Sequence, residues 1–322
     1  MAYQPSPSPP IKVAVAQFEP AYLDLSASVT KTCTLIQQAS ASGAKLVAFP
    51  ECWIPGYPAW IWARPVDFNL SAAYMKNSLK LDSAEMREIC ATAATCKIAV
   101  VLGFSENYND SLYIAQAIIG ADGAVKLSRR KLKATHMERT IFGDASGSSL
   151  ENVVDLPGVG RVGALACWEH TQPLLKYHTY HQNESIHVAA WPPVYEHDGG
   201  PGLFSMSSQG CHALSQAYAI ESQSFVLHAT AVLSSKAITL LQTSNGVTMN
   251  VPGGGSSAIF GPDGRMLAQG PEGTEEAFVY AELHPDEILK AKGFLDVCGH
   301  YSRPDLLWLG VDEREKRGVV SG

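Results

Sequence analysis

Short runs of β-branched and apolar residues alternate with helical stretches along the 322-residue chain, and this alternation limits the possible fold more than any other feature. Strands are predicted at residues 12–18, 45–49, 97–104, 112–119, 161–166, 186–190, 224–231, 256–260 and 277–283. Helices are predicted at residues 26–42, 83–96, 172–183 and 205–222. Because strands are spread evenly among helices, the pattern favours an α/β fold over separate all-α and all-β parts.

One sequence pattern occurs twice. Residues 117–128 read AIIGADGAVKLS and residues 258–269 read AIFGPDGRMLAQ, so both run strand, Gly-x-Asp-Gly, strand. Asp-Gly supplies the positive φ angles that tight hairpins need. The two hairpins, one late in each half of the chain, suggest two similar half-sheets that face each other.

Composition narrows the class of partner and the compartment. The net charge of −7 argues against nucleic acid as a main partner, and no apolar run approaches the roughly 20 residues that cross a bilayer. The first ten residues, MAYQPSPSPP, lack the basic and apolar regions of a signal peptide, so residues 1–10 are predicted to be a disordered leader. The seven cysteines are scattered and form no C-x-x-C pair, which favours reduced thiols in a soluble, cytoplasmic protein.

The chain divides after residue 283. Residues 11–283 carry the predicted strands and helices and are interpreted as one domain. The remainder, residues 284–322, includes GHYSRPDLLWLGVDEREKRGVVSG, a polar stretch with apolar islands. This extension is expected to pack on a neighbouring element or another subunit and to end in a mobile tail.

The stretch VGALACWEHTQP, residues 162–173, runs from an apolar strand into a cysteine and then into aromatic and charged residues. Two interpretations of Cys167 are open, because free cysteine is among the most buried residue types. It is either an inert packed residue or a nucleophile at a strand-to-helix elbow. In the second case the helix that begins near Thr171–Pro173 is expected to stabilise the thiolate through its N-terminal N–H groups.

A nucleophilic thiol needs a general base. In LVAFPECWIPGYPAW, Glu51 follows a buried apolar run, and Pro50 ends the strand before it. Burial predicts a raised pKa for Glu51, as a general base requires. A solvated loop carboxylate is the alternative.

Attack by a thiol on a substrate also needs a group that stabilises the negative charge developing on that substrate, and a cation suits this task. In SRRKLKATHMERT, the residues Arg129–Lys131 are interpreted as a solvated basic face. Lys133 is set apart from them, because strand alternation places it opposite Leu132. Glu138 is expected to pair with Lys133 or with Arg139, and either a structural pair or a catalytic role is open.

Three of these stretches together resemble the active-site blocks of the nitrilase superfamily. AFPE holds Glu51, KLKATHMERT holds Lys133, and ALACWEH holds Cys167, in the order that the family shows. IPGYP, HVAAWPP and GHYSRPD narrow the resemblance to true nitrilases, over residues 11–304 or so. Ala134 stands where the family usually has proline, which is expected to loosen the turn after Lys133.

The resemblance implies a four-layer αββα sandwich whose subunits pair into an eight-layer dimer and extend into spiral homo-oligomers through C-terminal segments. It also implies hydrolysis of a nitrile by water to a carboxylic acid and ammonia. The catalytic residues would be Glu51, Lys133 and Cys167, with Glu138 as a fourth polar participant. The reaction passes through a cysteine thioimidate and a thioester, with amide as a possible by-product, and it requires no metal or organic cofactor.

The substrate pocket is expected to be aromatic. Tyr57, Trp60, Trp168 and Trp191 lie beside the catalytic blocks, and His136 lies in the lysine block. Core packing is the alternative for each aromatic residue. Two or more of them in the pocket would favour arylaliphatic nitriles.

Other functions remain open at this stage. The related cyanide hydratases are expected to have Asn before the nucleophile, where Ala166 stands here, so arylacetonitriles are favoured over cyanide. An amidase or carbamoylase would use the same three catalytic residues. A non-catalytic scaffold is the alternative from another class, and the presence of all three polar residues argues against it.

Three further motifs are set aside. GVGRVG, residues 158–163, precedes a strand and opens no helix, so it is not a dinucleotide site. PGGGSS, residues 252–257, lacks the lysine of a P-loop. His178 and His181 have no third ligand at a suitable spacing for a metal, and no metal site is predicted.

Overall fold

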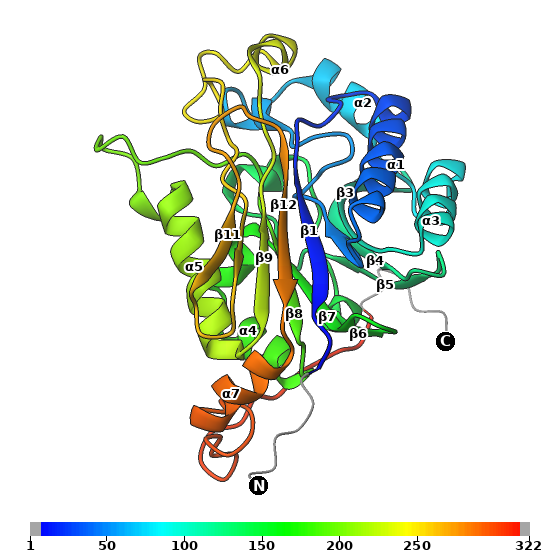
Figure 1. Ribbon diagram of the computed structural model, residues 1–322. Helices are drawn as coiled ribbons and strands as arrows, with labels where there is room; N and C mark the ends of the chain where they lie inside the picture. Colours follow the sequence, from blue (N-terminus) through cyan, green and yellow to red (C-terminus); the bar gives the residue numbers. More distant parts are fainter. Residues whose placement is uncertain (1–7, 316–322) are drawn as a thin grey trace, which may run out of the picture.

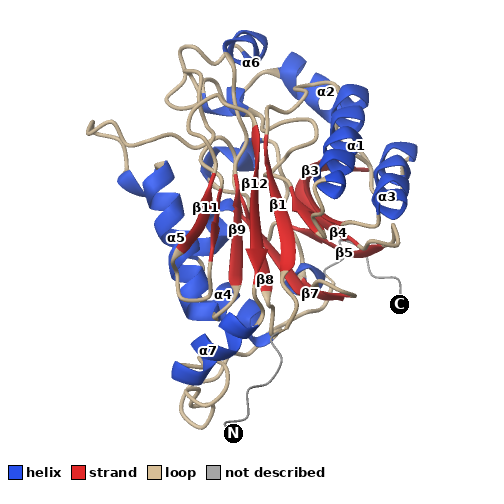
Figure 2. Ribbon diagram, in the orientation of Figure 1, coloured by secondary structure: helices blue, strands red, loops and turns tan. Residues whose placement is uncertain are grey.

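Two six-stranded sheets lie face to face with helices on their outer faces, in a computed structural model that describes residues 8–315 (Figures 1 and 2). This is the four-layer αββα sandwich that the family resemblance implies. Most of the expected leader, at residues 1–7, lies outside the described residues.

The first sheet has the strand order β12-β1-β2-β3-β4-β5. Its centre is parallel and both of its edges are antiparallel. The strands are β1 (Ile11–Gln17), β2 (Leu46–Ala48), β3 (Ala99–Tyr108), β4 (Ser111–Ile119), β5 (Val125–Arg130) and β12 (Ala277–Leu283).

The second sheet repeats this plan with the order β11-β10-β9-β8-β7-β6. Here too three parallel strands are flanked by antiparallel ones. The strands are β6 (Val153–Leu156), β7 (Gly160–Ala166), β8 (Ile186–Ala190), β9 (Phe225–Ala229), β10 (Ala258–Phe260) and β11 (Met266–Gln269). Strand β6 was not predicted.

The two repeated sequence patterns form the predicted hairpins, β4–β5 and β10–β11, at the edges of the two sheets. Gly123 and Gly264 take the positive φ angles of 77° and 83°. In each turn the aspartate carboxylate accepts a hydrogen bond from the backbone N–H two residues later: Asp122 from Ala124, and Asp263 from Arg265. The prediction of two similar facing half-sheets is confirmed.

The four predicted helices cover the outer faces, α1 (Leu25–Ala41) and α3 (Ala84–Cys96) on the first sheet, α4 (Pro173–His181) and α5 (Ser208–Ser222) on the second. Three helices were not predicted: α2 (Phe68–Asn77), α6 (Ser235–Leu241) and α7 (Asp286–Phe294). Figure 1 shows α2 and α6 among the loops at one end of the sandwich and α7 at the other. No helix within residues 8–315 has the length and apolar character needed to span a membrane.

Both faces of the central strands are buried, so their sequences are almost continuously apolar. In β1, Val13 and Val15 point between the sheets, whereas Ala14 and Ala16 face the layer that contains α1 and α3. This packing fixes the register of the sheets and therefore the positions of the residues that follow the strands.

The C-terminal extension contains α7 and then runs back across the molecule. Ser146 Oγ donates a hydrogen bond of 2.6 Å to the Glu315 carboxylate, which ties the end of the described chain to the domain. Residues 309–312 line a surface groove beside α4.

Candidate active site

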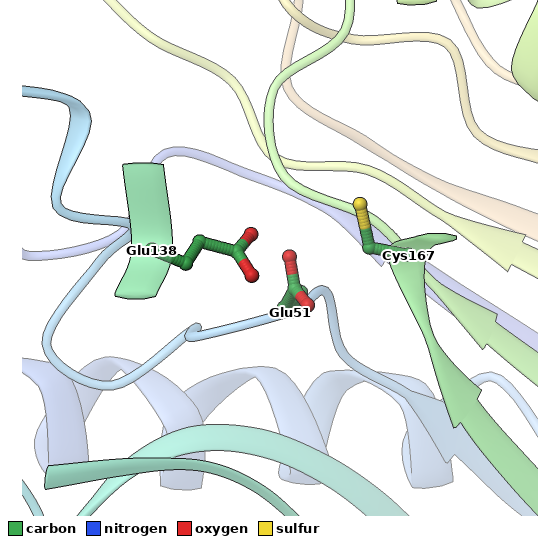
Figure 3. A group of neighbouring side chains, drawn as sticks. All are labelled: Glu51, Glu138 and Cys167. Carbon is green, nitrogen blue, oxygen red and sulfur yellow. The ribbon is translucent and has the colours of Figure 1, made fainter. Parts of the chain in front are cut away.

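The polar residues that carry the predicted chemistry come from the ends of strands in both sheets. Glu51 follows β2, Lys131 follows β5, and Cys167 follows β7. Glu138 comes from the 3-10 helix η2 (His136–Thr140). Figure 3 shows the two carboxylates and the thiol converging, and one ligand atom from each of Glu51, Glu138 and Cys167 lies within 4.8 Å of the others.

The cation of this cluster is Lys131, and the prediction of Lys133 is wrong. Lys131 Nζ lies 2.9 Å from Glu51 Oε1 and 2.8 Å from Glu138 Oε2, and its side chain is 1% exposed. The Lys133 side chain is 67% exposed and pairs with Asp144 at 2.5 Å.

The point where strand pairing ends explains the difference. In β5, Leu127 and Arg129 face the interior, and Lys131 continues this parity because its N–H still donates to Ile114 O at 2.7 Å. The strand pairing ends there, so the alternation cannot be extended to Lys133. Because both lysines share the parity of Leu127, alternation in the sequence does not distinguish them.

The expected solvated face at Arg129–Lys131 is also wrong, because Arg129 is fully buried. Its guanidinium donates two hydrogen bonds to Glu169, at 2.7 and 2.8 Å. The Glu169 carboxylate also accepts from the backbone N–H groups of Leu132 and Ala166, both at 2.9 Å. This carboxylate therefore fastens the residue after Lys131 to the residue before Cys167, a link that the sequence analysis missed.

The Glu51 backbone is held by close packing. Gly103 in β3 leaves room for the Pro50 carbonyl, which a Cβ at Gly103 would meet at 2.1 Å. Glu51 N–H donates to Trp191 O at 3.2 Å and so connects the loop after β2 to the second sheet.

The Glu51 carboxylate has the character of a general base. Burial raises its pKa to about 8, although the Lys131 charge opposes the shift. Its Oε1 accepts from Lys131, whereas no hydrogen-bond partner is found within the described residues for the buried Oε2. This oxygen is available to accept a proton, and the predicted rise in pKa is confirmed.

Glu138 is fixed on both oxygens. Oε2 accepts from Lys131 Nζ and from the Thr135 N–H at 2.7 Å, and Oε1 accepts from the Tyr57 hydroxyl at 3.0 Å. Tyr57 in turn accepts from Trp62 Nε1 at 3.2 Å. Of the two expected pairings, neither Lys133 nor Arg139 is the partner of Glu138, because Lys131 takes that position.

Cys167 occupies an elbow between β7 and α4, in the 3-10 helix η4 (Cys167–Thr171). Its φ of 50° lies in the left-handed region, which non-glycine residues rarely adopt outside constrained sites. Burial raises the pKa of the Cys167 thiol well above its ordinary value, and the Glu51 charge adds to this. Helix α4, which was expected to stabilise the thiolate, begins only at Pro173. The thiol therefore keeps its proton until a base removes it.

The ammonium of Lys131 supplies positive charge at the centre of the cluster. Burial lowers its pKa, but the charges of Glu138 and Glu51 outweigh burial and hold the pKa well above the ordinary lysine value. The acidic and thiol groups have a spacing that could hold a cation. Because Lys131 Nζ already lies within hydrogen-bond distance of the Glu51 and Glu138 carboxylates, its ammonium group is the cation of this cluster.

The predicted aromatic residues divide into two sets. His136 and Trp168 line a groove of about 830 Å³, together with residues 309–312. Tyr57, Trp60 and Trp191 are buried. Tyr57 reaches Glu138, whereas Trp60 packs edge-on against Tyr74 with ring centroids 5.2 Å apart.

Trp191 is a buried aromatic residue that packs against residues of the elbow. Its ring packs against those of Trp168 and His170, with centroids 6.4 and 5.4 Å apart. Trp62, which the sequence analysis missed, stacks on His136 at 5.4 Å and also lines a second groove of about 830 Å³.

Comparisons with known proteins agree with this architecture. The model of the carbon-nitrogen hydrolase family matches residues 12–292. The chain is 62% identical over 309 residues to an arylacetonitrilase of Aspergillus kawachii and 61% identical over 309 residues to one of Aspergillus niger, with 96% of this chain and 94% of each relative covered.

Among solved structures, a carbon-nitrogen hydrolase from Helicobacter pylori superposes with a TM-score of 0.72 at 16% identity, over 92% of this chain and 96% of that one. At this identity the likeness supports the fold alone. The family match and the two close relatives establish that the chain belongs to the carbon-nitrogen hydrolase family.

Proposed function

We propose that the protein is a nitrilase that hydrolyses arylacetonitriles to carboxylic acids and ammonia, with Cys167 as nucleophile, Glu51 as general base and Lys131 as the electrostatic catalyst. The observation that carries the proposal is the Lys131 ammonium, which contacts two buried carboxylates beside a buried thiol. The high identity to two arylacetonitrilases supports the substrate class.

The first step forms a thioimidate. Cys167 Sγ bonds to the nitrile carbon as one C–N π bond breaks, and the thiol proton passes to Glu51 Oε2 and then to nitrogen. The raised pKa of Cys167 requires this base, and a Glu51 pKa of about 8 suits transfer in both directions near neutral pH. Lys131 stabilises the negative charge that develops on nitrogen.

Two waters complete the reaction. Glu51 removes a proton from the first water, which adds to the thioimidate carbon to give a tetrahedral intermediate. Protonated nitrogen leaves as ammonia, and the thioester remains. The second water releases the carboxylic acid and restores the thiol. The covalent adduct divides one difficult hydrolysis into easier steps.

The tetrahedral intermediate has a second exit, in which sulfur leaves and an amide is released. A tenfold preference between the exits corresponds to about 1.4 kcal/mol of activation free energy. Glu138 helps to set this balance, because it holds Lys131 and is itself held by Tyr57. Some amide by-product is therefore expected.

The aryl group of the substrate is assigned to the aromatic side chains around the elbow. Trp168 and Trp191 lie edge to face beside Cys167, and Tyr57 approaches the same cluster through Glu138. Aromatic side chains favour an aromatic ligand through burial and edge-to-face contact. Trp60 is assigned to packing instead, because it lies in the interior against Tyr74.

The proposal extends to assembly and compartment. We assign the protein a homodimer as its basic unit, and we assign residues 284–315 the contacts that join these dimers into larger oligomers. Leu306, Leu307 and Trp308 support this, because they are 65%, 79% and 80% exposed. Seven free cysteines among the described residues support a cytoplasmic location. Replacement of Leu307 and Trp308 by serine should shift the protein to smaller species in sedimentation velocity.

The test of function is a substrate panel in which ammonia, acid and amide are all quantified. Phenylacetonitrile should give phenylacetic acid with some amide, faster than phenylacetamide or cyanide reacts. Cys167→Ala and Glu51→Gln should abolish turnover. Faster hydrolysis of phenylacetamide would indicate an amidase, faster hydration of cyanide would indicate a cyanide hydratase, and full turnover by either variant would refute the assigned roles.

A further inference from the structure

Two buried histidines from separate sequence motifs meet next to the nucleophile. His170 is the last residue of CWEH, and His187 is the first residue of HVAAWPP. Their Nε2 atoms lie 3.0 Å apart, and both residues are fully buried. The mechanism proposed above uses neither of them.

The pair is the middle of a longer hydrogen-bonded chain. At one end, His170 Nδ1 lies 2.7 Å from the carbonyl oxygen of Cys167. At the other end, His187 Nδ1 lies 2.8 Å from Glu184 Oε2, and the Tyr218 hydroxyl donates to Glu184 Oε1 at 2.5 Å. The chain thus runs from the elbow, through β8, to α5 on the outer layer.

The sequence makes room for this chain. Gly163 in β7 has no side chain where the Glu184 carboxylate lies, and a Cβ there would fall 2.0 Å from Glu184 Oε2. Gly163 belongs to the GVGRVG motif that was set aside above. Its third glycine therefore accommodates a buried carboxylate.

The direction of every hydrogen bond follows from the carbonyl at the end. Cys167 O can only accept, so His170 Nδ1 must carry a proton. If His170 is neutral, its Nε2 is an acceptor, and His187 must donate from Nε2. If His187 is neutral, its Nδ1 is an acceptor, and Glu184 must donate from a protonated Oε2. The whole chain is then uncharged and each donor faces an acceptor.

The alternative contains a buried ion pair. An ionised Glu184 would accept a hydrogen bond from His187 Nδ1. One histidine would then have to be protonated on both nitrogens: either His187, so that it still donates to His170, or His170, so that it donates to both His187 and Cys167 O. Burial opposes both states, because it raises the pKa of Glu184 well above its ordinary value, lowers that of His187 well below its ordinary value and lowers that of His170 to about 3.

We propose that the uncharged chain Tyr218–Glu184–His187–His170 is a positioning device for the nucleophile, which fixes the Cys167 carbonyl and so keeps the elbow in its left-handed conformation. The proposal rests on the proposed function of Cys167 as nucleophile. These residues act through Cys167 and do not touch the reacting atoms. Their loss should therefore lower kcat and leave KM nearly unchanged.

Two matched substitutions separate the hydrogen bond from simple packing. His170→Asn keeps an N–H donor close to the position of Nδ1 but loses contact with His187. His170→Gln can keep an acceptor, its amide oxygen, near the position of Nε2 but loses the donor to Cys167 O. Both lose the imidazole that packs on Trp191. We expect His170→Asn to keep kcat within about threefold and His170→Gln to lower it roughly ten- to a hundredfold. Equal losses in the two variants would overturn the proposal.

A second pair tests the charge state. Glu184→Gln can donate to His187 Nδ1 from its amide nitrogen and accept from Tyr218 at its oxygen, so it reproduces the uncharged chain. We expect it to keep kcat within about threefold, whereas Glu184→Ala should lose roughly tenfold or more. A Gln variant as impaired as the Ala variant would show that Glu184 must be ionised, and the uncharged chain would be refuted.

The alkylation of Cys167 by iodoacetamide makes the test independent of nitrile turnover, with Cys167→Ala as the blank. The alkylation rate of folded protein should follow the same order: wild type and His170→Asn together, His170→Gln slower. If no nitrile is turned over but this order holds, the proposed function fails and the positioning role stands. If nitriles are hydrolysed and all His170 variants are alkylated at the same rate, the positioning role fails.

Discussion

Two buried polar networks flank Cys167, and they compensate the cost of burial in different ways. On one side, the ammonium of Lys131 lies between the carboxylates of Glu51 and Glu138. On the other side, His170 and its partners form a chain in which no group needs a charge. A buried charge is tolerated only with a partner, whereas a neutral chain needs only that donors face acceptors. The first network can exchange protons with a substrate, and the second can only orient its neighbours.

Removal of the Lys131 cation should have the largest effect on activity and a large effect on stability. Lys131→Met leaves two buried carboxylates without their partner, so the free energy of unfolding should fall by about 3–5 kcal/mol. The variant also loses the group that meets charge on nitrogen, so kcat/KM should fall at least about a hundredfold. Denaturant titration and nitrile kinetics measure the two effects.

A double variant distinguishes charge balance from catalysis. Lys131→Met combined with Glu138→Gln removes one charge of each sign from the cluster. Stability should recover in part relative to Lys131→Met, because only one buried carboxylate, that of Glu51, is left without the cation instead of two, while activity should stay low. Recovery of activity in the double variant would show that Lys131 has only a structural role.

The pH dependence of kcat/KM should follow the charged network alone. In the proposed mechanism Glu51 acts in its ionised form, and its raised pKa of about 8 means that the ionised fraction falls as the pH is lowered below 8. We therefore expect kcat/KM to drop about tenfold for each pH unit below this value. His170 on the other side does not titrate in this range, because burial lowers its pKa to about 3.

His170→Asn is the control for this assignment. The acidic limb of the pH profile is the fall of kcat/KM below about pH 8. This variant should leave the position of that limb unchanged when kcat/KM is measured across pH 5–9. A limb that moves in this variant, or that lies near pH 4 in the wild-type protein, would contradict the assignment of Glu51 as the titrating base.

The Arg129–Glu169 pair connects the two sides of the site, and its loss should have an intermediate effect. Arg129→Met leaves the Glu169 carboxylate without its cation, so the free energy of unfolding should fall by about 3–5 kcal/mol. The two backbone N–H groups that Glu169 accepts from remain in place, so activity should fall less than in Lys131→Met. Denaturant midpoints and kcat of the folded fraction provide the comparison, and a loss of activity as large as that of Lys131→Met would assign Arg129 a catalytic role.

Local sequence patterns predict the α/β class and the two facing half-sheets, through apolar runs and Gly-x-Asp-Gly turns. They also predict the strand ends at which Glu51 and Cys167 lie. The four-layer sandwich came from the family resemblance. Helices α2, α6 and α7 were missed because α2 and α6 lie in long loops and α7 shows only an exposed, weakly apolar face. Helices α2 and α6 begin at the side-chain caps Asp67 and Ser234 and bury part of one face, so caps and tertiary contacts support them more than their own period does.

The choice between Lys131 and Lys133 depended on where strand pairing ends. Both lysines have the same parity, and only the last backbone hydrogen bond of β5 decides which one faces the interior. The His170–His187 contact was equally invisible, because it joins residues brought together by the pairing of β7 with β8. Long-range contacts of this kind require the register of the sheet, which single-sequence patterns do not specify.

Lys133→Met should have the smallest effect and is the matched control for Lys131→Met, because it makes the same substitution two positions away. The Lys133 ammonium contacts Asp144 at the surface, where an ion pair is screened by water and salt. We expect kcat/KM within about twofold of wild type and no change in the denaturant midpoint. A loss of turnover comparable to that of Lys131→Met would mean that the exposed lysine reaches the substrate, and the division between a buried catalytic cation and a solvated one would have to be abandoned.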